Sequence, residues 1–174
     1  MVLLPSAAYA EGGQGAEYSK TETIYVDEEI IIEERLTVYD DGSSVSRATQ
    51  TKSASKDFLI KNSDGNVVAT YTLNGTFSYN GSSATCTKAS YSTSVSNIFW
   101  SFSSASATKS GSSAKGAFTA KCVFPSKTIS KNVTLTCSKN GTIIVKSKPR
   151  KERRKEERGP RNGRKDSFRG PRIF

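Results

Sequence analysis

Hydrophobic and polar residues alternate along most of the chain, which is the pattern of β-strands with one buried face. The clearest case is residues 70–79, where one side of the strand carries Tyr71, Leu73, Gly75, Phe77 and Tyr79. Three later segments alternate in the same way: Ile98, Trp100 and Phe102; Phe118, Ala120, Cys122 and Phe124; and Val133, Leu135 and Cys137. We expect each of these sets to face a hydrophobic core.

Turn residues separate these segments at short intervals. Asp64-Gly65, Asn80-Gly81 and Asn140-Gly141 are hairpin signals, because glycine accepts a positive φ angle. Residues 109–113 predict a further reversal, and β-branched content favours one strand over a helical turn at residues 24–39. Seven to nine short strands are typical of an all-β protein, and we expect a single antiparallel, immunoglobulin-like β-sandwich.

Charge divides the chain near its C-terminal end. Residues 146–174 hold 13 Lys and Arg against 4 acids, which is +9 of the total formal charge of +10. This segment has no hydrophobic period, so we expect a disordered basic tail. Three interpretations of it stay open: a segment that binds polyanions such as cell-wall polymers, a solvated tail, or a frameshifted or read-through sequence. Nucleic acid is the least favoured polyanion, because no aromatic residue interleaves the charges before Phe168.

The N-terminus contains Ala8-Tyr9-Ala10, the small-x-small pattern that precedes a signal-peptidase cut after Ala10. No basic residue precedes Lys20 and the apolar run is short, so we interpret residues 1–10 as a truncated signal peptide. The alternative is an ordinary N-terminus that contains the pattern by chance. Residues 11–21 are then a flexible segment, and residues 22–145 are the β-sandwich domain. From the signal pattern we expect a secreted or cell-wall-associated protein, and we expect a monomer. No stretch approaches the roughly 20 apolar residues that span a bilayer, so we expect no transmembrane segment.

Three cysteines allow three single disulfide pairings. We predict a bond between Cys86 and Cys137, because both lie mid-strand in a Thr-Cys context and close a long loop. A turn at residues 125–127 would place Cys122 opposite about Ser130 and away from Cys137, which predicts a free, buried thiol. The cysteine spacings contain no C-x-x-C and the chain has no histidine, so we expect no metal and no cofactor.

The absence of histidine removes the commonest general base and the Ser-His and Cys-His nucleophile pairs. We therefore expect that the protein is not an enzyme. A glycosidase-type carboxylate pair is the remaining route, but adjacent acids on a strand point to opposite faces. The sequence offers three such doublets: Glu28/Glu29, Glu33/Glu34 and Asp40/Asp41. Phe99 and Tyr91 are weak candidates for a sugar-stacking surface, whereas Trp100 is expected in the core.

Residues 62–86 (NSDGNVVATYTLNGTFSYNGSSATC), 104–111 (SASATKSG) and 134–141 (TLTCSKNG) resemble uncharacterised small secreted proteins of Gram-positive anaerobes. The resemblance extends over about Glu22 to Ile144. It implies export, one β domain and a paired Thr-Cys disulfide, and it implies no activity. Cys122 and the residues after Val145 depart from the family pattern.

The leading hypothesis is therefore a non-catalytic secreted or surface-associated module for interaction or adhesion. The alternative is a module that binds carbohydrate or wall polymer, with the cationic tail adding affinity. A carboxylate-dependent glycosidase is the third hypothesis.

Overall fold

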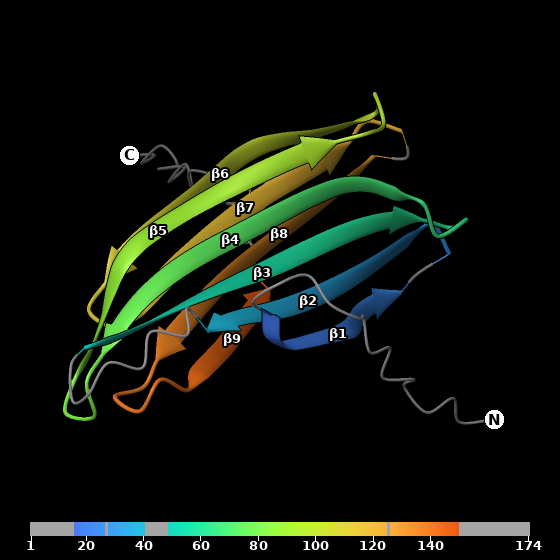
Figure 1. Cartoon of the computed structure of the whole chain (residues 1–174). Coiled ribbons are helices and arrows are strands. Elements are labelled where there is room, and N and C mark those ends of the chain that lie inside the picture. Colours follow the sequence, from blue (N-terminus) through green and yellow to red (C-terminus); the bar gives the residue numbers. More distant parts are fainter. Residues whose placement is uncertain (1–15, 27, 41–48, 125, 150–174) are drawn as a thin grey trace, which may run out of the picture.

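The chain folds into two antiparallel β-sheets packed face to face, as a computed structural model shows for residues 16–26, 28–40, 49–124 and 126–149 (Figure 1). The described residues form no helix. The first sheet holds β1 (Ala16–Val26), β2 (Ile30–Asp40), β3 (Gln50–Asn62), β4 (Val67–Tyr79) and β5 (Ala84–Val95). The second holds β6 (Trp100–Ser110), β7 (Ser113–Cys122), β8 (Lys127–Cys137) and β9 (Ile143–Pro149). The prediction of an all-β sandwich with up to nine strands is confirmed.

Each strand pairs with the next one along the chain, so the topology is an uninterrupted meander. An immunoglobulin-like sandwich has Greek-key connections that carry strands between its sheets. Here the chain passes from one sheet to the other only once among the described strands, at the turn between β5 and β6. The connectivity therefore differs from the immunoglobulin-like arrangement that we expected. Within each sheet, every connection except residues 41–49 is only two to five residues long, and hairpins of this length join neighbouring antiparallel strands.

The structure corrects the predicted domain boundaries at both ends. β1 begins at Ala16, so residues 16–21 belong to the first sheet and not to a flexible segment. β9 ends at Pro149, so residues 146–149 belong to the second sheet and not to the tail. Residues 24–39 form two strands, β1 and β2, where we expected one. Both errors at the ends concern edge strands, which pair through the backbone and bury few side chains, so their hydrophobic pattern is weak.

The predicted signal remnant with Ala8 and Ala10, and the tail beyond Pro149, lie outside the described residues. The predicted hairpins do lie inside them, and each contains a glycine with a positive φ. Gly65 and Gly141 both adopt a φ of +81° at their turns, a conformation that residues with a Cβ rarely take. The turn predictions from Asp64-Gly65 and Asn140-Gly141 are confirmed.

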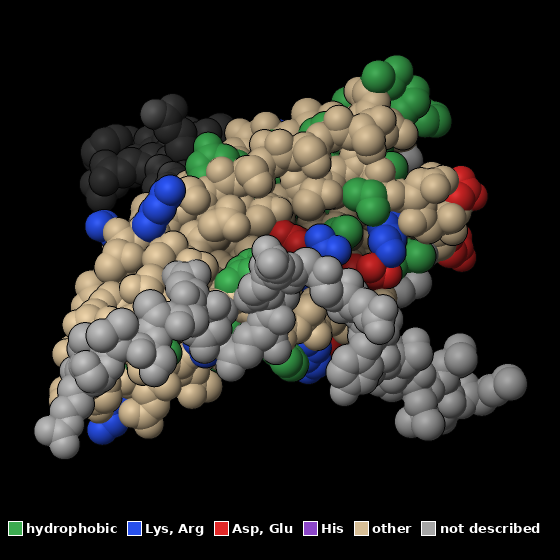
Figure 2. Space-filling view, in the orientation of Figure 1, with side chains coloured by type: hydrophobic (Ala, Val, Ile, Leu, Met, Phe, Trp, Pro, Cys, Tyr) green, Lys and Arg blue, Asp and Glu red, His purple; other side chains and the backbone are tan. Residues whose placement is uncertain are grey.

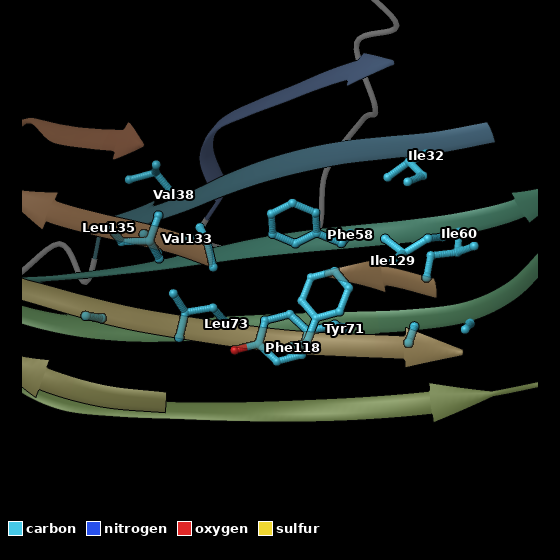
Figure 3. Close-up of a cluster of buried hydrophobic side chains, with 14 of the residues drawn as sticks. Ile32, Val38, Phe58, Ile60, Tyr71, Leu73, Phe118, Ile129, Val133 and Leu135 are labelled. Carbon is cyan, nitrogen blue, oxygen red and sulfur yellow. The ribbon is translucent and has the colours of Figure 1, made fainter. Parts of the chain in front are cut away.

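The core lies between the sheets and is centred on aromatic side chains from both (Figure 3). Every second residue of β4 from Tyr71 to Tyr79 is buried, as the alternation predicted. The ring of Phe118, from β7, lies 4.6 Å from that of Tyr71 and 5.2 Å from that of Phe58, measured between centroids. This trio joins the two sheets at mid-strand.

Tyr71 also makes a polar contact across the core. Its hydroxyl donates a hydrogen bond of 2.7 Å to the carbonyl oxygen of Ser106 in β6. Burial raises the pKa of Tyr71 to about 12, with the nearby Tyr91 adding to the shift, so the hydroxyl keeps its proton at ordinary pH. The hydroxyl occupies the space beside Gly116, where a Cβ would collide with it and would lie 3.1 Å from atoms of Leu73 and Val133.

We predict that Gly116→Ala lowers the free energy of unfolding by about 1–3 kcal/mol, the usual cost of overpacking a core. Urea denaturation measures the change. Tyr71→Phe removes the oxygen that the new methyl group meets, so the double variant should cost less than the sum of the two single variants. Costs that simply add would contradict this account of Gly116.

Candidate functional site

The two aromatic residues predicted to form a sugar-stacking surface lie in different elements, β5 and the turn that follows it, and each is about half exposed. Tyr91 stands opposite Leu73 on the core side of β5, and its ring stacks on Tyr71 with 6.0 Å between centroids and 15° between planes. The cause is a register shift in the pairing of β4 with β5, between Lys88 and Cys86. The extra residue, Thr87, changes which face later residues of β5 occupy. Phe99 instead lies in the turn between β5 and β6 and is half exposed.

Two residues predicted to face the core are exposed. β6 begins at Trp100, which is buried as expected, whereas Ile98 precedes it and is 92% exposed. β7 ends at Cys122, so Phe124 lies in the following turn and is 81% exposed. The alternation in the sequence includes both positions, but β6 begins after Ile98 and β7 ends before Phe124.

These corrections reveal a cluster of exposed apolar side chains, which we call the apolar tip: Ile98, Phe99, Val123 and Phe124. The backbone N–H of Val123 donates to the carbonyl oxygen of Phe99 at 2.9 Å, so the two turns are joined. Figure 2 shows hydrophobic atoms protruding at the upper right corner, where Figure 1 places these turns. Soluble proteins rarely gather exposed apolar side chains without a binding role.

The turns that carry the apolar tip are held in place by hydrogen bonds. The side-chain oxygen of Asn97 accepts the N–H of Phe99 at 2.9 Å, and its carbonyl oxygen accepts the N–H of Trp100 at 3.0 Å. The N–H and the hydroxyl of Ser96 donate to the carbonyl oxygens of Val68 and Val67 in β4, respectively. The turn that carries Ile98 and Phe99 is therefore held by hydrogen bonds within itself and to β4.

A second feature is a shallow cavity of about 300 Å³ on the first sheet, which we call the polar hollow. Most of its side chains carry hydroxyl, amide or amino groups, and they come from the outward-facing positions of four strands: Tyr39, Ser53, Ser55, Asn74, Thr76, Lys88 and Ser90. The hydroxyl oxygens of Ser53 and Thr76 lie 3.3 Å apart. An aromatic ring beside many hydroxyl and amide groups suits a polar, hydroxylated ligand.

The acidic doublet Glu33/Glu34 divides between the two faces of β2, as expected for neighbours on a strand. Glu33 forms an ion pair of 2.7 Å with Lys61, while Glu34 points into the protein. There it pairs with Lys56 at 2.9 Å, and the two side chains are only 4% and 6% exposed. Ser147 of β9 donates its hydroxyl to the same oxygen of Glu34 at 3.1 Å. Oε1 of Glu34 is buried and has no hydrogen-bond partner among the described residues.

We predict that Lys56→Met lowers the free energy of unfolding by about 3–5 kcal/mol, because it leaves the charge of Glu34 buried and unpaired. The double variant Lys56→Met/Glu34→Leu should recover most of that loss, since the desolvation cost disappears along with the attraction. Urea denaturation of the three proteins measures both effects. If the double variant has as low a free energy of unfolding as Lys56→Met, the unpaired charge of Glu34 is not the cause of the loss, and this account of the ion pair is wrong.

The predicted disulfide between Cys86 and Cys137 is absent from the structure, where both residues and Cys122 are free, buried thiols. Their backbone N–H groups bind neighbouring residues of one turn, Gly111 and Ser112, so the two strands do converge there. The sulfurs nevertheless point to separate acceptors, the carbonyl oxygens of Lys88 and Ser138, each at 3.3 Å.

Cys122 is free and buried, as predicted, but it stands opposite Lys127 and not Ser130. The turn after β7 is therefore tighter than the sequence indicated.

We predict that all three thiols react with iodoacetamide when the protein is unfolded without a reductant, and that they react slowly in the native protein. Burial raises the pKa of both Cys86 and Cys137, so less of the reactive thiolate is present at any given pH below the raised value. The native alkylation rate should rise only at a higher pH than it does for a free thiol. Intact mass spectrometry counts the labels. One label in place of three would show that two of the cysteines form a disulfide.

Among the described residues, no group of three Cys, Asp or Glu side chains is placed to hold a metal ion. The same part of the chain contains no helix long and apolar enough to cross a membrane. Comparison of the chain with protein-family models, curated proteins and solved structures finds no match. The resemblance to small secreted proteins of Gram-positive anaerobes therefore stays a prediction.

Proposed function

We propose that this chain is a non-catalytic interaction module, secreted or displayed at the cell surface, that contacts its partner through the apolar tip. The observation that carries the proposal is the exposure of Ile98 and Phe124 on two turns that a backbone hydrogen bond joins. Large apolar side chains held in water are costly unless a partner covers them. The export pattern at Ala8-Tyr9-Ala10 supports a location outside the cell.

The geometry of the support favours binding over chemistry at this end of the protein. The four side chains of the apolar tip are hydrocarbon, and they supply neither a nucleophile nor an acid or base. What they supply is apolar area on a rigid frame, and pre-organised apolar area lowers the entropy cost of association.

A second candidate function is the binding of a carbohydrate or wall polymer in the polar hollow. The observation that favours it is the row of hydroxyl and amide side chains beside Tyr39, which is 39% exposed, with Lys88 at the rim to meet an anionic group. The basic residues beyond Pro149 would add a salt-sensitive attraction to a phosphate-rich polymer.

Retention of fluorescently labelled protein on intact Gram-positive cells separates the two functions. We expect the variant Ile98→Ser/Phe124→Ser to lose most of the retention, by about tenfold or more, because each buried large apolar side chain contributes about 1.5–3 kcal/mol. Ile144→Ser is the matched control, since Ile144 is also exposed but lies on β9 toward the opposite end of the sandwich.

Under the second function the outcome is reversed. Tyr39→Ala/Lys88→Ala would abolish retention while the tip variant retained it, and free wall polymer would compete with the cells. Equal retention of all four proteins would contradict both functions. Thermal unfolding of each variant verifies that the folded state is intact.

A further inference from the structure

The shape of the apolar tip limits what can cover it. Its side chains belong to two turns at the end of a sandwich, so they protrude and do not line a groove. A stable protein interface needs about 800 Å² from each partner, with a well-packed centre. Two adjoining turns offer a narrow convex surface, which suits insertion into a deformable layer better than docking on a protein.

The apolar surface continues from the tip toward the first sheet. Val95, at the end of β5, is 43% exposed, and Val67, at the start of β4, is 38% exposed. Ser96 stands two residues before Ile98 and donates two hydrogen bonds to the N-terminal end of β4, so Val67 and Val95 adjoin the tip. Such a gradient, most exposed at the extremity, is expected of a surface that enters the interfacial region of a bilayer by a few ångströms.

The remaining sequence supplies a charge that matches an anionic surface. Residues 150–174 contain 11 Lys and Arg against 4 acids. They follow Pro149, which pairs with Lys131, only four residues from the start of β8 beside the tip. A segment of 25 residues is long enough to reach any surface that the tip touches. Stable membrane association commonly needs two such contributions, an apolar one and a basic one.

Three acidic residues at this end of the sandwich have a partner, and a fourth, Glu28, is exposed. Glu29 and Glu33 are neutralised by ion pairs with Lys127 and Lys61, at 2.5 and 2.7 Å. Asp64 accepts a hydrogen bond from Asn62 in the turn between β3 and β4, on the first sheet. Glu28 and Asp64 stay exposed at this end, and the 11 Lys and Arg of residues 150–174 outnumber them.

We infer that the apolar tip inserts into the interface of an anionic lipid membrane, with the basic residues after Pro149 bound to the headgroups. This inference rests on the proposed function for its contact surface and names the partner as a lipid bilayer. It involves insertion of side chains only and no transfer of the chain across the bilayer.

Vesicle flotation with the full chain tests the inference, using phosphatidylcholine vesicles with and without phosphatidylglycerol. We expect binding to the anionic vesicles that weakens as salt is raised, because the headgroup attraction is screened. Ile98→Ser/Phe124→Ser should lower the partition coefficient by about tenfold or more, and Ile144→Ser should leave it unchanged. Trp100 is the only tryptophan and adjoins Phe99, so brominated lipids should quench its fluorescence in the wild type and not in the tip variant.

Absence of binding to either vesicle overturns the inference, as does binding that the tip variant retains in full. The cell experiment distinguishes this failure from failure of the proposed function. If retention on cells depends on the tip while vesicles do not bind, the partner is a protein and only the membrane assignment falls. If neither depends on the tip, both proposals fall.

Discussion

The architecture depends on the contact that Tyr71 makes between the two sheets. Its ring stacks on Phe118, its hydroxyl binds the carbonyl of Ser106, and that hydroxyl fills the space that Gly116 leaves by having no Cβ. The three partners belong to β6 and β7, more than 30 residues away in sequence. A slip of one residue in either sheet would turn its buried face outward, so this contact fixes the registration of one sheet on the other.

The fixed registration also explains the apolar tip. Trp100 and Cys122 form the last rung of the β6–β7 pair at that end, and both are buried. Residues beyond the rung, Ile98 and Phe124 among them, cannot reach the core without breaking the ladder. The hydrophobic pattern extends past the ends of β6 and β7, and the apolar side chains beyond those ends are exposed to water. A surface that is costly in the isolated protein is the one that a partner can stabilise by covering it.

The sequence predicted the parts of the fold that depend on neighbours along the chain. Alternation identified β4 and its buried face, and Asp64-Gly65 and Asn140-Gly141 identified their hairpins, because these features need only local conformation. The edge strand β1 was missed, since pairing on one side requires little burial. The face occupied by Tyr91 was missed as well, because the register shift at Thr87 is decided by the pairing with β4.

By itself, then, the sequence determined an all-β chain, the position of its turns and the uneven charge that collects after residue 145. Only the tertiary structure decided which apolar residues stay exposed, that Glu34 and Lys56 share the interior, and that Cys86 and Cys137 remain free thiols. The reason is the range of the interactions. Strand alternation and turns depend on adjacent residues, whereas burial, ion pairing and thiol geometry depend on segments brought together from distant positions.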